Sequence, residues 1–213
     1  MNSNHPGWPA TLVHDRVTLR PYRRTDAPVW SAVRRANEEW LARWEPASGT
    51  SWQHANSPAG FRALLRELRK SAKHGGVWPF AICYDGRLVG GMTVGNIVRR
   101  AFCSAHVGYW IDEGHAGRGI TPTALGLVCD HAFGRGGLHR IEVNIQPHNT
   151  PSRRVVEKLG FRQEAMYRAY LYINGQWRDH VGYGMTVEDV TEGGVLARWL
   201  NRSQTNQKAA SDS

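Results

Sequence analysis

The chain has 213 residues, 41% of them hydrophobic, which is enough for one domain with a sizeable core. Its 27 Lys and Arg against 18 Asp and Glu give a net charge of +9, which favours anionic partners such as a phosphorylated cofactor or RNA. The sequence has no apolar run long enough to span a membrane, no signal-peptide pattern, and three widely spaced cysteines without metal-ligand spacing. These features argue against a membrane protein, and we expect a cytoplasmic protein without a metal site.

We expect three regions along the chain: a lead-in over residues 1–16, the domain over residues 17–187, and a C-terminal helix and polar tail over residues 188–213. Within the domain, alternating and apolar runs predict strands, and Asp85-Gly86 and Asn174-Gly175 predict hairpin turns. The expected strands cover 17–22, 78–84, 88–98, 102–111, 139–147, 161–173 and 176–187, and the expected helices lie within 26–44, after 57, after 119, and over 152–159 and 192–201. This order predicts an α/β (α+β) fold with a mixed, mostly antiparallel central sheet flanked by helices.

A glycine loop joins an expected strand to an expected helix between Val107 and Phe133. The first N–H groups of a helix have no partner inside it and lie at the positive end of its dipole, so a phosphate can bind there. Gly119 is followed by Ile120 and Pro122 rather than by the residues of a Walker loop or a dinucleotide fingerprint. These residues alone are compatible both with a pyrophosphate-binding loop of another kind and with an ordinary strand-to-helix turn.

Two segments together resemble the Gcn5-related N-acetyltransferase (GNAT) family. Ala116–Thr121 resembles the coenzyme A loop Gln/Arg-x-x-Gly-x-Gly/Ala, with Gly119 as its central glycine, although Ala116 and Thr121 depart from the pattern. Asn149-Thr150-Pro151-Ser152, followed by Lys158-Leu159-Gly160-Phe161, resembles the family's second motif at the expected distance. The resemblance covers roughly residues 17–187 and implies the GNAT fold and acetyl-CoA as the cofactor.

Within the family, the chain is most similar to the ribosomal-protein alanine acetyltransferases of the RimJ/RimL branch. The most distinctive segment is Gly175-Gln176-Trp177-Arg178-Asp179-His180-Val181. The resemblance implies that Asn149 holds the pantetheine arm and that the main chain of Ile111 pairs with it as an added strand would. The implied cofactor-binding residues are Ile111, Ala116, Gly117, Arg118, Gly119, Ile120, Thr121, Asn149 and Ser152.

Acetyl transfer to an amine requires a neutral amine, a donor for the oxyanion and a proton for the leaving thiolate. The resemblance places Ser152 near the thiol, and the alternative is that Ser152 only caps its helix. Glu142 is a candidate for accepting the amine proton through water, and the alternative is a salt bridge with an arginine. Tyr109 is a candidate proton donor to the thiolate, and the alternative is a core aromatic.

The chain offers no single compelling base, which favours an easily neutralised amine. A protein α-amine has a pKa near 8 and a lysine side chain near 10.4, so lysine costs roughly 3 kcal/mol more to neutralise. We therefore expect a protein N-terminus as substrate, with Glu45 pairing with the α-ammonium and Trp177 lining the peptide pocket; core packing is the alternative for the tryptophans. The partner implied is a ribosomal protein, with weak electrostatic contact to the ribosome or RNA.

Two other functions stay open. The first is acetylation of a small-molecule amine, such as an antibiotic or a polyamine, because one fold serves many amines. The second is a non-catalytic ribosome-binding module, because Ala116 and Thr121 depart from the coenzyme A loop pattern.

Overall fold

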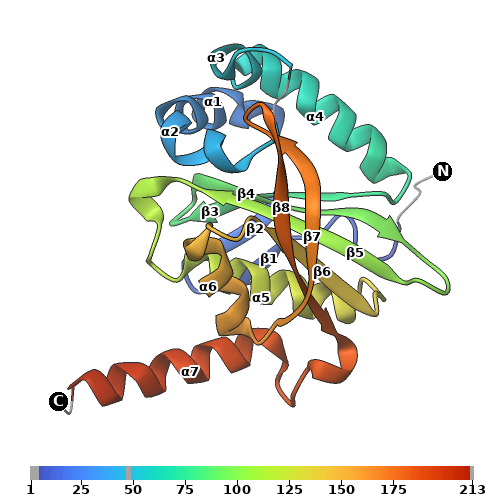
Figure 1. Ribbon diagram of the computed structural model, residues 1–213, viewed down its shortest axis with the longest axis vertical. Coiled ribbons are helices and arrows are strands. Elements are labelled where there is room, and N and C mark those ends of the chain that lie inside the picture. Colours follow the sequence, from blue (N-terminus) through green and yellow to red (C-terminus); the bar gives the residue numbers. More distant parts are fainter. Residues whose placement is uncertain (1–4, 47–48, 212–213) are drawn as a thin grey trace.

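An eight-stranded sheet organises the protein in the computed structural model, which describes residues 5–46 and 49–211 and the side chains as far as residue 203. The strand order is β1-β2-β3-β4-β5-β6-β8-β7, and every neighbouring pair is antiparallel except β5 and β6 (Figure 1). The strands are β1 (Leu12–His14), β2 (Val17–Pro21), β3 (Trp78–Tyr84), β4 (Arg87–Val98), β5 (Ser104–Ile111), β6 (Arg140–Ile145), β7 (Arg162–Ile173) and β8 (Gln176–Thr186). The mixed, mostly antiparallel sheet confirms the predicted fold class.

Helices cover both faces of this sheet, with α1 to α4 on one side and α5 to α7 on the other (Figure 1). They are α1 (Ala27–Ala36), α2 (Glu38–Leu41), α3 (Trp52–Ala55), α4 (Pro58–Lys73), α5 (Ile120–Phe133), α6 (Thr150–Leu159) and α7 (Gly194–Ser211). Short 3₁₀ turns complete the connections: η1 (Arg24–Asp26), η2 (Ala42–Trp44), η3 (Glu113–His115) and η4 (Val187–Asp189). We call the side with α5 and α6 the core face and the other side the open face.

Alternation along the strands decides which residues reach the core face. Ile141, Val143 and Ile145 of β6 are buried there against the main apolar core. Helix α5 is buried on nearly all sides because the sheet covers one side of it and α7 another. Gly126 of α5 permits that approach, because a Cβ there would lie 3.1 Å from the Leu196 backbone.

A second apolar cluster fills the open face over β2, β3 and β4. Trp30 of α1 packs against Phe61 of α4 with ring centroids 4.8 Å apart, and Leu65 completes the cluster. This cover does not extend over β6, β8 and β7, where the open face carries Arg140, Glu142 and other polar side chains. The site described below lies where the apolar cover ends.

Most predicted elements agree with the structure to within two or three residues, and β3 agrees at both ends. The structure adds β1 within the expected lead-in, of which residues 1–4 lie outside the described residues. Helix α7 continues to Ser211, well past the expected end at Asn201; residues 212–213 of the expected polar tail are outside the described residues. A search of the described helices finds none that combines the length and apolar character needed to cross a bilayer.

Candidate active site

The site is a split in the sheet between β5 and β6. These parallel strands pair only at Ser104↔Arg140, Ala105↔Ile141 and His106↔Glu142, and then diverge. A cavity of about 840 Å³ occupies the opening. Tyr109 and Ile111 line it from the core side of β5, whereas Gly108 and Trp110 line it from the open side. The cavity is therefore reached from both faces of the sheet.

The glycine loop forms the core-face end of this cavity. Gly117 and Gly119 both have φ of +76°, a left-handed conformation that favours glycine, and α5 begins directly after Gly119. Within the described chain, the N–H groups from Gly117 to Thr121 have no protein acceptor, while the Gly119 carbonyl accepts from Thr123. Five consecutive free donors at a helix start fit a pyrophosphate. Of the predicted loop residues, Arg118 alone does not line the cavity.

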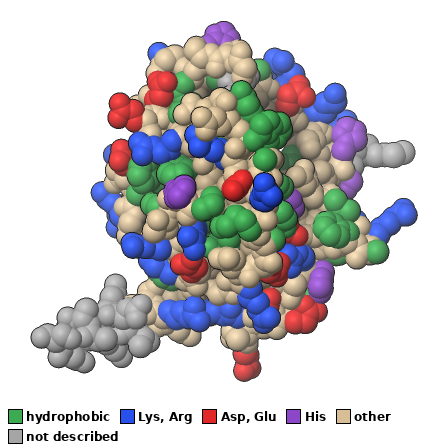
Figure 2. All heavy atoms as spheres, in the orientation of Figure 1, with side chains coloured by type: hydrophobic (Ala, Val, Ile, Leu, Met, Phe, Trp, Pro, Cys, Tyr) green, Lys and Arg blue, Asp and Glu red, His purple; other side chains and the backbone are tan. Residues whose placement is uncertain are grey.

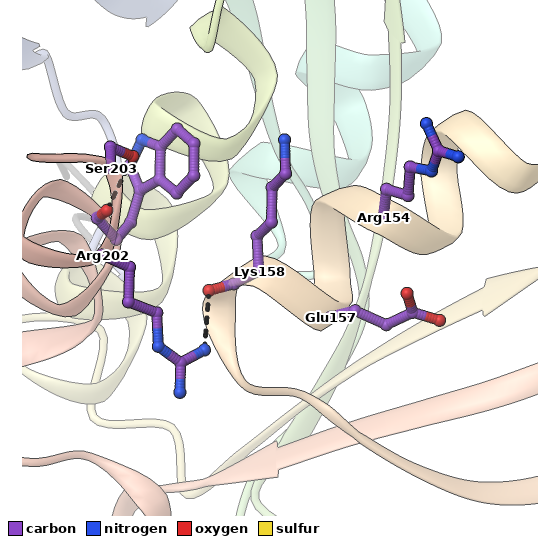
Figure 3. Close-up of a pocket in the computed structure, with 6 residues that line it drawn as sticks. Arg154, Glu157, Lys158, Arg202 and Ser203 are labelled. Atoms are coloured by element: carbon purple, nitrogen blue, oxygen red, sulfur yellow. Dashed lines mark hydrogen bonds between the residues drawn. The ribbon is translucent and has the colours of Figure 1, made fainter. Parts of the chain in front are cut away.

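A basic recess lies beside the loop, where α6 and α7 meet (Figure 3). Its volume is about 500 Å³, and the residues that line it include Arg154, Lys158 and Arg202 together with the acidic Glu157. Trp199 separates it from the glycine loop: its Nε1 donates to Thr123 Oγ1 at 3.1 Å, and Lys158 Nζ lies 5.4 Å from its ring centre. Sequence reasoning missed these residues, although Arg154 and Lys158 have the i, i+4 spacing that places two cations on one helix face.

The second motif contributes Asn149 and Ser152 to the same cavity. Asn149 caps α6, because its Oδ1 accepts from the Ser152 N–H at 3.2 Å. Ser152 is therefore the third residue of the helix and not its cap, which corrects the alternative considered from the sequence. No residue of the described chain binds the Ser152 hydroxyl, which is left available to a ligand.

Tyr109 lies against the start of α6. Its hydroxyl donates to the Ser152 carbonyl at 3.1 Å, and burial raises the pKa of the phenol, so it stays protonated at neutral pH. Ile111 also lines the cavity, and its carbonyl accepts from Trp40 Nε1 at 3.1 Å. That carbonyl has a second lone pair, so pairing with a pantetheine amide remains a prediction.

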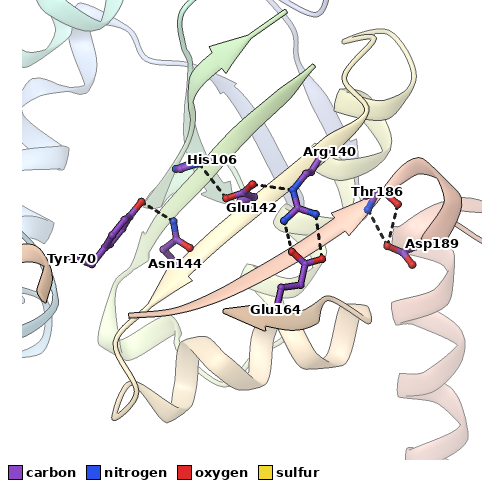
Figure 4. Close-up of polar contacts among 8 residues, drawn as sticks. All are labelled: His106, Arg140, Glu142, Asn144, Glu164, Tyr170, Thr186 and Asp189. Atoms are coloured by element: carbon purple, nitrogen blue, oxygen red, sulfur yellow. Dashed lines mark hydrogen bonds and ion pairs between the residues drawn. The ribbon is translucent and has the colours of Figure 1, made fainter. Parts of the chain in front are cut away.

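On the open face, Glu142 is held by Arg140 and His106 (Figure 4). Its oxygens lie 2.8 Å from Arg140 Nε and 3.3 Å from His106 Nε2, and Arg140 also binds Glu164. Glu142 is not among the residues that line the cavity. The arrangement is the salt bridge with an arginine that the sequence offered as the alternative to a proton-accepting role.

The two predicted substrate residues lie in different places. Glu45 lines the cavity, but both its oxygens accept from the buried Arg34, whose guanidinium lies 4.7 Å from the Trp52 ring centre and 4.9 Å from that of Trp110. Trp177 is 64% exposed at the tip of the β7–β8 hairpin and does not line the cavity. The hairpin tip does reach the segment after Glu45, through a bridge between Ile173 and Pro46.

Sequence reasoning missed three polar groups at or beside the open face of the cavity. His180 of β8 is buried and lines the cavity. Tyr170 of β7 packs against it with ring centres 5.4 Å apart and accepts a hydrogen bond from Asn144 Nδ2 at 3.0 Å. His180 belongs to the distinctive segment quoted above, but its place beside β6 depends on the strand order.

The comparisons with known proteins agree with this geometry. The family model of the acetyltransferase (GNAT) domain matches residues 16–162. Ribosomal protein uS5-alanine N-acetyltransferase of Escherichia coli (strain K12) is 31% identical over 184 residues, covering 85% of this chain and 93% of that protein. Probable N-acetyltransferase YjcK of Bacillus subtilis is 32% identical over 166 residues, covering 77% of this chain and 90% of that protein.

The solved structures include a similar protein with a bound cofactor. Mycobacterium smegmatis RimJ in complex with CoA-disulfide aligns with a TM-score of 0.91 and 38% identity, covering 94% of this chain and 98% of that one. The family model and these relatives, each covering most of the chain, confirm the resemblance seen in the two motifs. The chain therefore belongs to the GNAT family, in its RimJ/RimL branch, and is an acetyl-CoA-dependent acetyltransferase.

Proposed function

We propose that the protein transfers the acetyl group of acetyl-CoA to the N-terminal α-amine of a protein that begins with Ala or Ser, with a ribosomal protein as the natural substrate. The observation that carries this proposal is the cavity between β5 and β6, which is lined from both faces of the sheet. The free N–H groups of the glycine loop lie at one face, and the opening beside the β7–β8 hairpin lies at the other. A thioester and an amine can thus meet from opposite sides.

The residues of the core face fit the cofactor. The N–H groups of Gly117 to Thr121 would hold the pyrophosphate, and the cations Arg154 and Lys158 would lie near the remaining phosphate of the nucleotide. The donors are backbone groups, so the departures at Ala116 and Thr121 remove none of them. This weakens the case for a non-catalytic module. When bound, acetyl-CoA supplies the activated acetyl group.

Ser152 of α6 and Tyr109 of β5, which lies against the start of α6, would serve the leaving thiolate. The free hydroxyl of Ser152 can donate to the sulfur, and Tyr109 stays protonated beside it. Asn149 would contact the pantetheine arm with the amide nitrogen that is not used in capping α6. These roles rest on the shared cavity and on the family motif.

Ser152→Ala is expected to lower kcat by about tenfold to a hundredfold while KM for acetyl-CoA changes little, because the lost hydrogen bond forms as the thiolate leaves. Steady-state kinetics with both substrates varied would measure this. The melting temperature should stay near that of the wild type, since Asn149 rather than Ser152 caps α6. A loss confined to KM would assign Ser152 to cofactor binding.

The substrate assignment draws on two further facts. A relative that is 31% identical is named as an alanine N-acetyltransferase of ribosomal protein uS5, and the exposed Trp177 at the hairpin tip offers an aromatic surface to residues further along a peptide. A small-molecule amine would be too short to contact that outer surface. Acetylation of such an amine is the second candidate function.

A peptide beginning with Ala or Ser is expected to gain one acetyl group at its α-amine. The matched control is the same peptide with a blocked α-amine and a free lysine, which should stay unmodified because lysine is about 2.4 pKa units more basic. Mass spectrometry of the products distinguishes the two. Acetylated lysine, or an acetylated polyamine with an untouched peptide, would contradict the substrate proposal.

The net charge of +9 is the reason to expect a contact with the ribosome. Lys and Arg side chains are scattered among acidic and apolar ones over the face in Figure 2 and form no single block. We propose a weak contact that falls with rising salt, because exposed charges are screened within about 8–10 Å.

A further inference from the structure

Acetylation of an α-ammonium group requires a proton acceptor on the open face of the cavity, where the amine enters under the proposed function. Glu45 lines the cavity, Glu142 lies on the same side of the sheet without lining it, and each has an arginine partner. Glu45 accepts from both arms of Arg34, and Glu142 contacts Arg140 and His106. Both carboxylates are therefore already engaged in ion pairs with arginine side chains.

His180 is the buried imidazole on the same face. It is 3% exposed and lines the cavity. Its Nδ1 lies 3.1 Å from the Arg178 carbonyl, which can only accept, so Nδ1 carries the hydrogen of the neutral ring. Nε2 then has the free lone pair, and no residue of the described chain binds it. The imidazole is thus held in the tautomer that can take a proton at Nε2.

The pairing of β7 with β8 is irregular next to His180. Tyr167 pairs with His180 and Leu171 pairs with Arg178, so three residues of β7 stand opposite Asp179 alone. Ala169, in the middle, has φ of +46°, and its N–H donates to Asp179 Oδ1 at 2.7 Å.

The irregularity brings two tyrosines to one face of the sheet. Tyr167 and Tyr170, three residues apart, stack with ring centres 5.0 Å apart. Tyr170 thereby lies against the imidazole of His180 while its hydroxyl accepts from Asn144 on β6. Gly182 leaves room for this arrangement, because a Cβ there would lie 2.6 Å from the Tyr167 ring.

The groups around His180 favour its neutral form. Burial lowers the pKa of His180 below its usual 6.5, and this outweighs the Arg178 carbonyl and Asp179, which act in the opposite direction. From β7 it faces the phenol rings of Tyr167 and Tyr170, and the paired Glu45 lines the same cavity. His180 is therefore neutral at pH 7 and able to accept a proton.

We propose that His180 is the catalytic residue that accepts the proton of the substrate α-ammonium, through Nε2. The proton passes from the ammonium to Nε2 and leaves a neutral amine whose lone pair attacks the thioester carbon. The C–N bond forms and the C–S bond breaks. The thiolate takes a proton from the Ser152 hydroxyl, which regains one from water, and the amide nitrogen loses its second proton to water. The imidazolium releases its own proton to solvent when the product leaves. This inference rests on the proposed function.

The test compares His180→Gln with the wild type over pH 6–9, using acetyl-CoA and a peptide that begins with Ala. Glutamine can form a hydrogen bond but cannot accept the proton. We expect kcat/KM for the peptide to fall by about a hundredfold at pH 7, as for loss of a general base. The deficit should shrink about tenfold by pH 9, because the neutral fraction of an amine with pKa near 8 rises from about one-tenth to about nine-tenths. Affinity for acetyl-CoA by calorimetry should stay unchanged.

The matched control is His74→Gln, at an exposed histidine outside the cavity, which should behave as the wild type at every pH. A His180→Gln deficit of the same size at pH 7 and pH 9 would overturn the proposal and leave a structural role. Full activity in that variant would also overturn it.

NMR of the imidazole nitrogens in the wild-type protein gives a second measurement, which does not depend on folding of the variant or on the identity of the amine. A neutral ring with hydrogen on Nδ1 at pH 7 supports the proposal, and hydrogen on Nε2 overturns it. If the wild type acetylates no peptide, the proposed function fails. The pH comparison is then made with the amine that is acetylated.

Discussion

Gly119→Glu is expected to weaken binding of acetyl-CoA by about a hundredfold. Gly119 has φ of +76°, which costs a residue with a Cβ about 1–2 kcal/mol, and the strain would turn the following N–H groups away from a phosphate. A carboxylate a few ångströms from the pyrophosphate adds about 2–3 kcal/mol of repulsion at the effective dielectric of a protein surface. Because 1.4 kcal/mol corresponds to a tenfold change in affinity, about 2.8 kcal/mol of the combined strain and repulsion is enough for the hundredfold loss. Calorimetry with acetyl-CoA would measure it.

Gly86→Glu is the matched control for this change. Gly86 also has a positive φ, +74°, but it lies in the β3–β4 hairpin, where a Cβ would have no neighbouring atom within 4 Å. The strain and the added charge are therefore the same, and the phosphate is absent. Affinity should be unchanged in Gly86→Glu. Equal affinities in Gly119→Glu and the wild type would contradict the placement of the pyrophosphate.

Glu45→Gln is expected to lower the free energy of unfolding by about 3 kcal/mol. Arg34 is buried, with its side chain 8% exposed, and Glu45 neutralises it from a position 30% exposed. Removing one partner of a buried pair leaves the other charge uncompensated, which costs about 3–5 kcal/mol, and the partial exposure of Glu45 favours the lower end. Asn56 still accepts from Arg34 Nε, but it carries no charge. Chemical denaturation would measure the loss.

Asp85→Asn provides the control, because the Arg16–Asp85 pair is about half exposed on both sides and should contribute less than about 1 kcal/mol. The double variant Arg34→Met with Glu45→Gln should recover much of the lost stability, since it removes the unpaired charge. If Glu45 serves the substrate instead, Glu45→Gln would be as stable as the wild type and would raise KM for the peptide.

The core-face half of the site could be predicted because its chemistry is local. A glycine loop before a helix dictates positive φ at Gly117 and Gly119 and free N–H groups after them, whatever surrounds the segment. The cap of α6 is equally local, since Asn149 reaches a residue three positions away. The same short-range rules predicted the two hairpin turns and the faces of β6.

The particular residues that pair with the acidic side chains were harder to predict from the sequence than the glycine loop was. Alternation placed Arg140 and Glu142 on one face of β6, but the pairing of Arg140 with Glu164 required the register of β7 on β8 and of β8 on β6. Glu45 meets Arg34 only because α1, α2 and η2 fold back on one another. Periodicity gives the face on which a side chain lies and not the residue that it meets.

The sequence by itself determined the family, the glycine loop before α5 and the mixed sheet, because motifs, turns and alternation act over a few residues. Only the tertiary structure decided the open face of the site. The order β6-β8-β7 carries His180 to the edge of the cavity, and three residues of β7 opposite one of β8 turn Tyr170 onto it. Such contacts join residues far apart in the chain, and they form because burying the core face of the sheet fixes which strands lie side by side and in what register.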